Sequence, residues 1–262
     1  MKYFGGCDVG STYTKCVIID ENGQIVANTT IRSKINAEIS AKEALELTIK
    51  QVPGLNQIAD LTYLVGTGYG RNKVPQADEN ISEISCHAMG VHVTNPEVKA
   101  IIDIGGQDVK GIQIDSDGTV KTFAMNDKCA AGTGRFFEAM AHAFECSLDE
   151  FSSLSLSAKN AIPITAQCTV FAESEVISLV GEGKPRDEIA AGIQQAVAKR
   201  CFVMAKKAGA TDKITLTGGC AKNIGLKKAI ENVLRIKVVE LKTDPQLMGA
   251  LGAAEYARQK GM

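Results

Sequence analysis

Two aspartates occupy the same place in a short pattern that occurs twice in the chain, at an offset of 95 residues from Asp8 to Asp103. Carboxylates bind Mg²⁺ or its waters, and the backbone N–H groups of glycine-rich turns bind phosphate oxygens. Two such turns facing each other across one cleft suit a magnesium-bound nucleotide. The two copies are Asp8-Val9-Gly10 with Lys15, Asp20 and Gly23, and Asp103-Ile104-Gly105 with Lys110, Asp115 and Gly118.

Each copy lies between apolar runs, which predicts a strand, a glycine-rich turn and a second strand, with the acid at the end of the first strand. Around these hairpins, strand and helix patterns alternate along the chain, which favours the α/β class. Further strands are expected over 61–65, 213–217 and 236–241. Helices are expected from a capping box at Ser40 and Glu43 to about Gln51, over 80–91, after 134, after 168, over 187–208, after Gly219 to Leu234, and after Asp244 with Pro245 in the first turn.

A third glycine-rich turn, Thr217-Gly218-Gly219, follows the strand predicted at 213–217. The chain contains no Walker A sequence, and a Rossmann turn runs from strand to helix, whereas these hairpin turns run from strand to strand. The set resembles the actin-like ATPase superfamily, which includes sugar kinases, acetate kinases and heat-shock chaperones. The resemblance implies an actin-like (ribonuclease H-like) two-lobed α/β fold. Its lobes would be residues 1–95 plus 245–262, and residues 96–244.

The same resemblance assigns roles to individual residues. Asp8 and Asp103 would hold magnesium through water and orient the attacking water, with Gln107 as the third member of the catalytic set. Lys15 could reach a phosphate, and the role of Lys110 stays open. Plain β-hairpin turns, in which Asp and Gly are common, are the alternative interpretation. The phosphate loops would be Gly10-Ser11-Thr12 and Gly105-Gly106-Gln107, and Gly218 and Gly219 would pack against adenosine.

Two of the eight cysteines, Cys129 and Cys168, come just before predicted helices. Backbone N–H groups and the helix dipole favour a thiolate at such a place. A 4Fe-4S cluster ordinarily needs four cysteine thiolates, and a two-fold homodimer would supply four from two per chain. From spacing alone, two buried thiols are the better interpretation.

Longer runs around these cysteines carry a more specific resemblance, to the activator proteins (component A) of (R)-2-hydroxyacyl-CoA dehydratases. These are BadF/BadG/BcrA/BcrD-type ATPases, related to the ATPase subunits of benzoyl-CoA reductase. The resemblance implies a homodimer with one 4Fe-4S cluster bridging the subunits through Cys129 and Cys168, and no role for the other six cysteines. It rests on the runs at 103–108, 125–135 and 168–175, together with 68–71, 85–90 and 217–219.

The implied activity joins the two sites. A one-electron donor of this kind takes an electron from reduced ferredoxin or flavodoxin, and uses ATP and Mg²⁺ to pass it at low potential to a dehydratase (component D), in anaerobic amino-acid fermentation. Lowering the potential by a few hundred millivolts costs roughly 5–10 kcal/mol for one electron, at about 2.3 kcal/mol per 100 mV. One or two ATP hydrolyses can supply that energy.

Composition argues against a nucleic-acid-binding protein and against a membrane protein. The formal net charge of -1 gives no basic excess for nucleic acid, and no apolar run reaches the length of a membrane span. The start of the chain leads into a strand and not into a signal peptide, so we expect a cytoplasmic protein. A small-molecule kinase of the same superfamily is the competing reading, and a zinc-bridged dimer is a further one. The acyl group of the partner dehydratase stays open.

Overall fold

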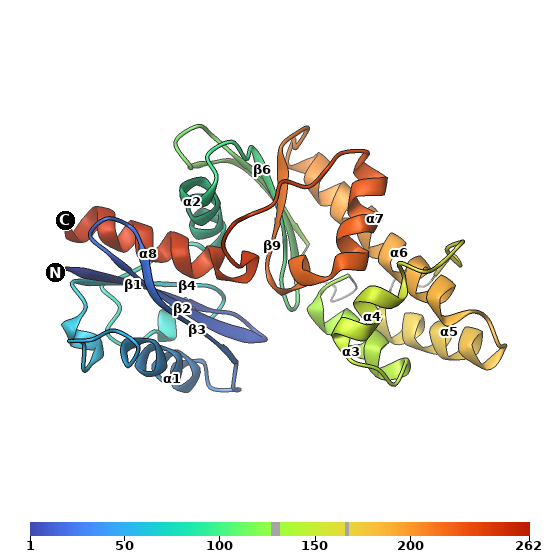
Figure 1. Ribbon diagram of the computed structural model, residues 1–262, viewed down its shortest axis with the longest axis horizontal. Helices are drawn as coiled ribbons and strands as arrows, with labels where there is room; N and C mark the ends of the chain where they lie inside the picture. Colours follow the sequence, from blue (N-terminus) through green and yellow to red (C-terminus); the bar gives the residue numbers. More distant parts are fainter. Residues whose placement is uncertain (127–131, 166–167) are drawn as a thin grey trace. The chain divides into compact units, whose positions relative to one another are not determined.

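The computed structural model describes residues 1–126, 132–165 and 168–262. The chain forms two compact units, each with its own mixed sheet and hydrophobic core (Figure 1). The α/β class predicted from the sequence is therefore confirmed. The first unit comprises Met1–Lys99, Ile114–Lys121 and Leu241–Met262, and the second comprises Ala100–Gln113 and Thr122–Glu240.

The sheet of the first unit has the strand order β3-β2-β1-β4-β5. Strand β1 is central: it pairs antiparallel with β2, as the hairpin pattern predicted, and parallel with β4. The strands are β1 (Tyr3–Val9), β2 (Tyr13–Asp20), β3 (Ile25–Arg32), β4 (Tyr63–Thr67) and β5 (Glu79–Asn80).

Helices cover both faces of this sheet (Figure 1). Helix α1 (Ala37–Ile49) packs on one face, and α8 (Met248–Gly261) packs on the other, where α2 (Glu83–Thr94) lies against it. Alternate residues of β1 point to opposite faces. Cys7 and Val9 belong to the apolar core that includes α1, whereas a Cβ on Gly6 would meet the backbone of α8. Helix α8 therefore approaches the sheet closely.

The sheet of the second unit has the strand order β8-β7-β6-β9. Here β6 is the equivalent of β1, because it pairs antiparallel with β7 and parallel with β9. Helices α6 (Arg186–Lys207) and α7 (Ile224–Leu234) pack against each other beside this sheet. No helix in the described part of the chain is long and apolar enough to cross a membrane. The strands are β6 (Ala100–Ile104), β7 (Val109–Ile114), β8 (Val120–Asn126) and β9 (Ile214–Thr217).

A cluster of helices completes the second unit: α3 (Gly134–Ala143), α4 (Leu148–Leu154) and α5 (Thr169–Gly181). Helix α3 buries one apolar face, as its spacing predicted, whereas α4 was not predicted. Phe144 and Phe151 meet edge to face, with ring centroids 5.2 Å apart, so aromatic packing joins α3 to α4. Short 3₁₀ helices lie at Ile58–Asp60, Arg71–Lys73, Gly219–Lys222 and Pro245–Leu247.

The capping box predicted at Ser40 is wrong. Helix α1 begins at Ala37, because the Asn36 side chain accepts hydrogen bonds from Glu38 N–H at 2.9 Å and from Ile39 N–H. An Asn at this place satisfies the first free N–H groups of the helix as well as a Ser does. Ser40 lies one turn further on, and its hydroxyl donates to Asn36 O.

The strand predicted over 236–241 is also wrong. Val239 N–H does donate to Ile214 O at 2.8 Å, so the segment runs beside β9. However, the Thr215 hydroxyl donates to Val239 O at 2.7 Å and takes the acceptor that a backbone ladder with β9 would use. The Asp244 cap is confirmed: its carboxylate accepts Gln246 N–H at 2.9 Å, and Pro245 starts the 3₁₀ turn that leads into α8.

Candidate active site

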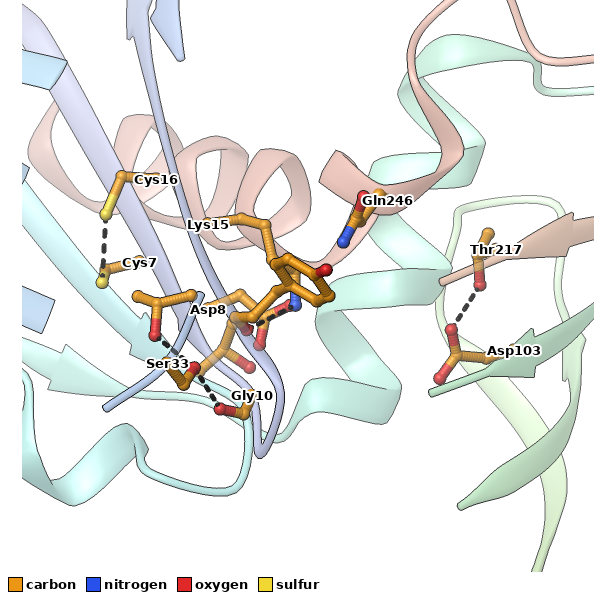
Figure 2. A network of polar contacts seen from close by, with 12 residues as sticks. Cys7, Asp8, Gly10, Lys15, Cys16, Ser33, Asp103, Thr217 and Gln246 are labelled. Carbon is orange, nitrogen blue, oxygen red and sulfur yellow. Dashed lines mark hydrogen bonds and ion pairs between the residues drawn. The ribbon is translucent and has the colours of Figure 1, made fainter. Parts of the chain in front are cut away.

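The first predicted carboxylate, Asp8, lies next to the end of β1, directly opposite Lys15 on β2. Lys15 Nζ is 2.6 Å from Asp8 Oδ2, and Asp8 is 3% exposed (Figure 2). A buried carboxylate needs a compensating charge, and Lys15 supplies it. The repeat spacing of seven residues therefore pairs an acid and a base across the hairpin.

The turn between β1 and β2 requires glycine at position 10. Gly10 N–H donates to Tyr13 O at 3.1 Å, and a Cβ on Gly10 would lie 2.7 Å from that oxygen and 3.3 Å from Lys15 Nζ. Ser33 braces the turn, because its hydroxyl donates to Gly10 O at 2.7 Å and its N–H donates to Thr12 O at 2.8 Å (Figure 2). The Thr12 hydroxyl is buried and has no hydrogen-bond partner.

The second carboxylate, Asp103, lies opposite Lys110 in the hairpin of β6 and β7. Lys110 Nζ is 3.2 Å from Asp103 Oδ2 and 2.9 Å from Asp108 Oδ2, so two carboxylates compensate this buried cation. Gly105 N–H donates to Asp108 O at 3.0 Å and closes the turn. Gln107 is exposed in that turn.

The start of α3 holds the second turn in place. Gly134 N–H donates to Gly105 O at 2.9 Å, and Arg135 N–H donates to Gly106 O at 3.0 Å. A helix N-terminus has N–H groups without intrahelical acceptors, and here two of them are satisfied by the turn. The first residues of α3 are thus tied to the second glycine-rich turn.

Each hairpin has an equivalent neighbour on a parallel strand, and the sequence did not predict its place beside the aspartate. Each aspartate has a buried threonine beside it at the end of a parallel strand: Thr67 on β4 for Asp8, and Thr217 on β9 for Asp103. The Thr217 hydroxyl donates to Asp103 Oδ1 at 2.8 Å (Figure 2). The only signal in the sequence is that a glycine follows each threonine.

Those glycines, Gly68 and Gly218, have positive φ of 88° and 83°. A Cβ on Gly218 would lie 2.9 Å from Asp103 Oδ1, and a Cβ on Gly68 would meet Asp8 Oδ1. Both positions therefore require glycine, because the positive φ disfavours other residues and because a Cβ would meet the carboxylate oxygen. Gly219 is exposed at the start of its 3₁₀ helix.

Helices α2 and α8 close the site behind Asp8. A Cβ on Gly249 of α8 would lie 2.8 Å from Asp8 Oδ2 and 2.9 Å from Nε2 of His87 on α2. His87 is 6% exposed and belongs to the run at 85–90 that carried part of the resemblance. No pattern in the sequence indicates that this histidine lies beside the first carboxylate.

The structure brings the predicted residues together in two groups. In the first unit, Asp8 and Lys15 flank the turn of Gly10, Ser11 and Thr12. In the second unit, the turn of Gly105, Gly106 and Gln107 follows Asp103, and Gly218 lies beside that carboxylate. The unpartnered Thr12 hydroxyl can hydrogen-bond a phosphate oxygen, and each carboxylate is a group that suits a hydrated Mg²⁺.

The cysteines divide by exposure. Cys168 is exposed and is the N-cap residue of α5, while Cys129 lies outside the described residues. Burial raises the pKa of the Cys86 and Cys201 thiols to about 12, as expected for core residues. No group of three or more His, Cys, Asp or Glu side chains that could hold a metal occurs among the described residues. Of the remaining cysteines, Cys7, Cys16 and Cys220 are buried and Cys146 is half-buried.

Comparison with known proteins gives matches along nearly the whole chain. The model of the BadF/BadG/BcrA/BcrD ATPase family matches residues 6–257. The activator of lactoyl-CoA dehydratase from Anaerotignum propionicum is 45% identical over 255 residues, which are 97% of this chain and 97% of that protein.

Two solved structures are similar to this protein along nearly the whole chain. The (R)-2-hydroxyglutaryl-CoA dehydratase component A of Acidaminococcus fermentans superposes with a TM-score of 0.93 at 39% identity, covering 100% of this chain and 99% of that one. The activator of the 2-hydroxyisocaproyl-CoA dehydratase from Clostridium difficile, solved with bound ADPNP, gives 0.92 at 42% identity, covering 99% and 95%.

Fold and hairpins together define an ATPase with the actin-like fold, as the duplicated pattern predicted. More narrowly, the chain belongs to the BadF/BadG/BcrA/BcrD ATPase family. A glucokinase from Streptomyces griseus shares the fold alone, with a TM-score of 0.59 at 14% identity, so the kinase reading gains no support from it.

Proposed function

We propose that this protein is an ATP-dependent one-electron donor that activates a 2-hydroxyacyl-CoA dehydratase. The observation that carries the proposal is the 45% identity, over 97% of both chains, to an activator of lactoyl-CoA dehydratase. Reduced ferredoxin or flavodoxin is the proposed source of the electron. ATP hydrolysis is the proposed source of the energy that lowers its potential.

In the nucleotide site, Asp8 and Asp103 hold hydrated Mg²⁺ and orient the attacking water, with Gln107 assisting in the second turn. The Thr12 hydroxyl and the Gly10 turn contact phosphate oxygens, a role supported by the unpartnered Thr12 hydroxyl. Lys15 is the better candidate for a phosphate contact than Lys110, because Lys110 already faces two carboxylates.

In the proposed dimer, Cys129 and Cys168 of each subunit are the four thiolate ligands of one 4Fe-4S cluster. The exposure of Cys168 supports this assignment, since a ligand shared between subunits must lie at the surface of each one. The N-terminus of α5 also favours negative charge beside it. When bound, the cluster supplies a site that holds and releases one electron.

Reconstitution tests the proposal as a whole. The anaerobically purified protein is mixed with the lactoyl-CoA dehydratase of Anaerotignum propionicum, Mg²⁺, ATP and a strong reductant, and dehydration of lactoyl-CoA is measured. Activity should require ATP and reductant together, and ADP should not replace ATP. Dehydration that proceeds equally without this protein would exclude an activating role in the assay.

Iron analysis separates the remaining alternatives. The wild-type protein should be brown and carry about four irons per dimer, and Cys168→Ser should be colourless. Cys146→Ser is the matched control, because Cys146 is a half-buried thiol without a proposed role, and it should stay brown. A colourless wild-type protein that contains zinc would support the zinc-bridged dimer instead. A colourless wild-type protein that transfers phosphate to a sugar or carboxylate would support the kinase instead.

A further inference from the structure

Two cysteines without a role in the proposed function lie side by side in the first hairpin. Cys7 on β1 and Cys16 on β2 are opposite each other in the antiparallel register. The Cys16 thiol donates a hydrogen bond to Cys7 Sγ, with 3.2 Å between the sulfurs (Figure 2). Both side chains are fully buried in the core between the sheet and α1.

The backbone geometry of this pair suits a disulfide. Gly10 N–H donates to Tyr13 O, and hydrogen-bonded and non-hydrogen-bonded pairs alternate from there along the hairpin. Cys7 and Cys16 therefore form a non-hydrogen-bonded pair, in which the Cα atoms are about 4.5 Å apart. Disulfides span Cα separations of about 4.4–6.8 Å, so a bond can close within this hairpin with only a small shift of the two strands.

We propose that Cys7 and Cys16 form a reversible disulfide that lowers ATP hydrolysis, an inference that rests on the proposed role of Asp8 and Lys15 in the nucleotide site. Asp8 and Lys15 are the next opposed pair along the same two strands. They point to the opposite face of the sheet, toward α8. A bond between the cysteines thus acts on the strands that hold the acid and the base.

The oxidant is a peroxide. In the first step, a cysteine sulfur attacks one peroxide oxygen, the O–O bond breaks, and a sulfenic acid and one water form. In the second step, the other thiol attacks the sulfenic sulfur, the S–S bond forms, and the sulfenic oxygen leaves as a second water. Two thiols and one hydrogen peroxide give one disulfide and two waters, with the sulfurs oxidised by two electrons. Either sulfur can act as the first nucleophile, because the two thiols are equally buried and their sulfurs are 3.2 Å apart.

Closing the bond shortens the Cβ–Cβ separation from about 4.5–5.5 Å to about 3.8 Å. A displacement of about 1 Å in a catalytic group can lower turnover by about 100-fold. We therefore expect at least a tenfold loss of ATP hydrolysis in the oxidised protein. Formation should be slow, because buried thiols meet the oxidant only when the hairpin opens locally.

The test treats the anaerobically purified holoprotein with hydrogen peroxide, then blocks free thiols in denaturant and maps peptides by mass spectrometry. ATP hydrolysis is measured before oxidation, after it, and after dithiothreitol. A peptide crosslinked through Cys7 and Cys16 should form together with a loss of hydrolysis that dithiothreitol reverses. Damage to the iron centre is not repaired by a thiol reductant, so the reversible part of the loss reports thiol oxidation, and the part that Cys7→Ala abolishes reports this disulfide.

Variants make the outcomes distinct. Cys7→Ala should show neither crosslink nor reversible loss, whereas Cys201→Ala, which removes a buried thiol of the second unit, should behave like wild type. Absence of the crosslink after the exposed thiols are fully oxidised would overturn the proposal, and so would a crosslinked protein that hydrolyses ATP at the full rate. Normal hydrolysis by Asp8→Asn would instead refute the nucleotide assignment, while the peptide map would still decide whether the disulfide forms.

Discussion

At the scale of single residues, the two candidate carboxylates are held in nearly the same way. Asp8 and Asp103 are each paired with a lysine across a hairpin and flanked by a buried threonine on a parallel strand. Their second oxygens differ, because the Thr217 hydroxyl donates to Asp103, whereas the Thr67 hydroxyl donates to Ile81 O. Asp103 is therefore the more tightly fixed of the two.

Replacing Asp103 with asparagine should leave a folded protein that has lost most of its ATP turnover. The substitution keeps the size of the side chain and an acceptor for the Thr217 hydroxyl, but removes the charge that would hold Mg²⁺. Steady-state phosphate release with saturating Mg²⁺ and ATP, together with circular dichroism, checks both parts. Asp115→Asn, in the exposed turn of the same repeat, is the matched control, and hydrolysis at the same rate in both variants would show that the second hairpin is misassigned.

Gly249→Ala tests the packing behind Asp8. The new Cβ would lie within 3 Å of both Asp8 Oδ2 and His87 Nε2, so one of these groups must move, although alanine favours a helix by about 1 kcal/mol over glycine. We expect at least a tenfold lower kcat with retained helix content. Gly181→Ala on α5 has open space around the new Cβ and should keep wild-type turnover. Equal kcat in the two variants would mean that the space at Gly249 does not matter for catalysis.

At the scale of elements, α6 carries a thiol whose ionisation is coupled to folding. Cys201 is fully buried on this helix, and burial raises its pKa to about 12 from the 9.0 of an ordinary thiol. Below pH 9 both the folded and the unfolded chain keep the proton. Above it the unfolded chain releases the proton first and binds fewer protons than the folded one, so stability must fall as pH rises.

The free energy of unfolding should therefore decrease between pH 9 and pH 12, with Cys201 contributing about 1.4 kcal/mol per pH unit. Cys201→Ala removes this contribution, so its stability should fall less steeply over that range, whatever its stability at pH 7. Denaturant unfolding at several alkaline pH values gives both slopes. Parallel slopes for wild type and variant would show that the thiol ionises equally in the two states.

At the scale of the whole molecule, the proposal needs the nucleotide site and the cluster to influence each other. The second glycine-rich turn, the proposed phosphate loop, is tied to the start of α3 by two backbone hydrogen bonds, and α3 packs against α5, of which Cys168 is the N-cap residue. These contacts lie within one compact unit and give a continuous physical connection. A change of nucleotide at the turn can therefore bias the helix that begins at the proposed ligand.

We expect the reduced protein to differ between ADP and a non-hydrolysable ATP analogue. The rate at which a chelator removes iron, and the visible spectrum of the cluster, should both depend on which nucleotide is bound. The protein without nucleotide provides the baseline. Identical rates and spectra in all three states would argue against coupling, and the protein would then be an ATPase that carries iron without using it.

Much of this fold can be predicted from the spacing of residues that are close together in the sequence. The Asp-x-Gly turns and the lysine seven residues after each aspartate fix two hairpins, because the partners in a hairpin are neighbours in the chain. Competition from side chains explains two errors: Asn36 caps α1 ahead of Ser40, and the Thr215 hydroxyl takes the Val239 carbonyl that a strand over 236–241 would use to pair with β9. Both depend on side-chain hydrogen bonds that periodicity does not register.

By itself, then, the sequence determined the fold class, the two hairpins with their acid and base pairs, and the family to which the chain belongs. Only the tertiary structure decided what lies beside those pairs. Parallel pairing sets Thr67 next to Asp8 and Thr217 next to Asp103, and helix packing sets His87 and Gly249 behind Asp8. The physical reason is that parallel strand register and helix packing join residues distant in the chain, and no local pattern records which of them will meet.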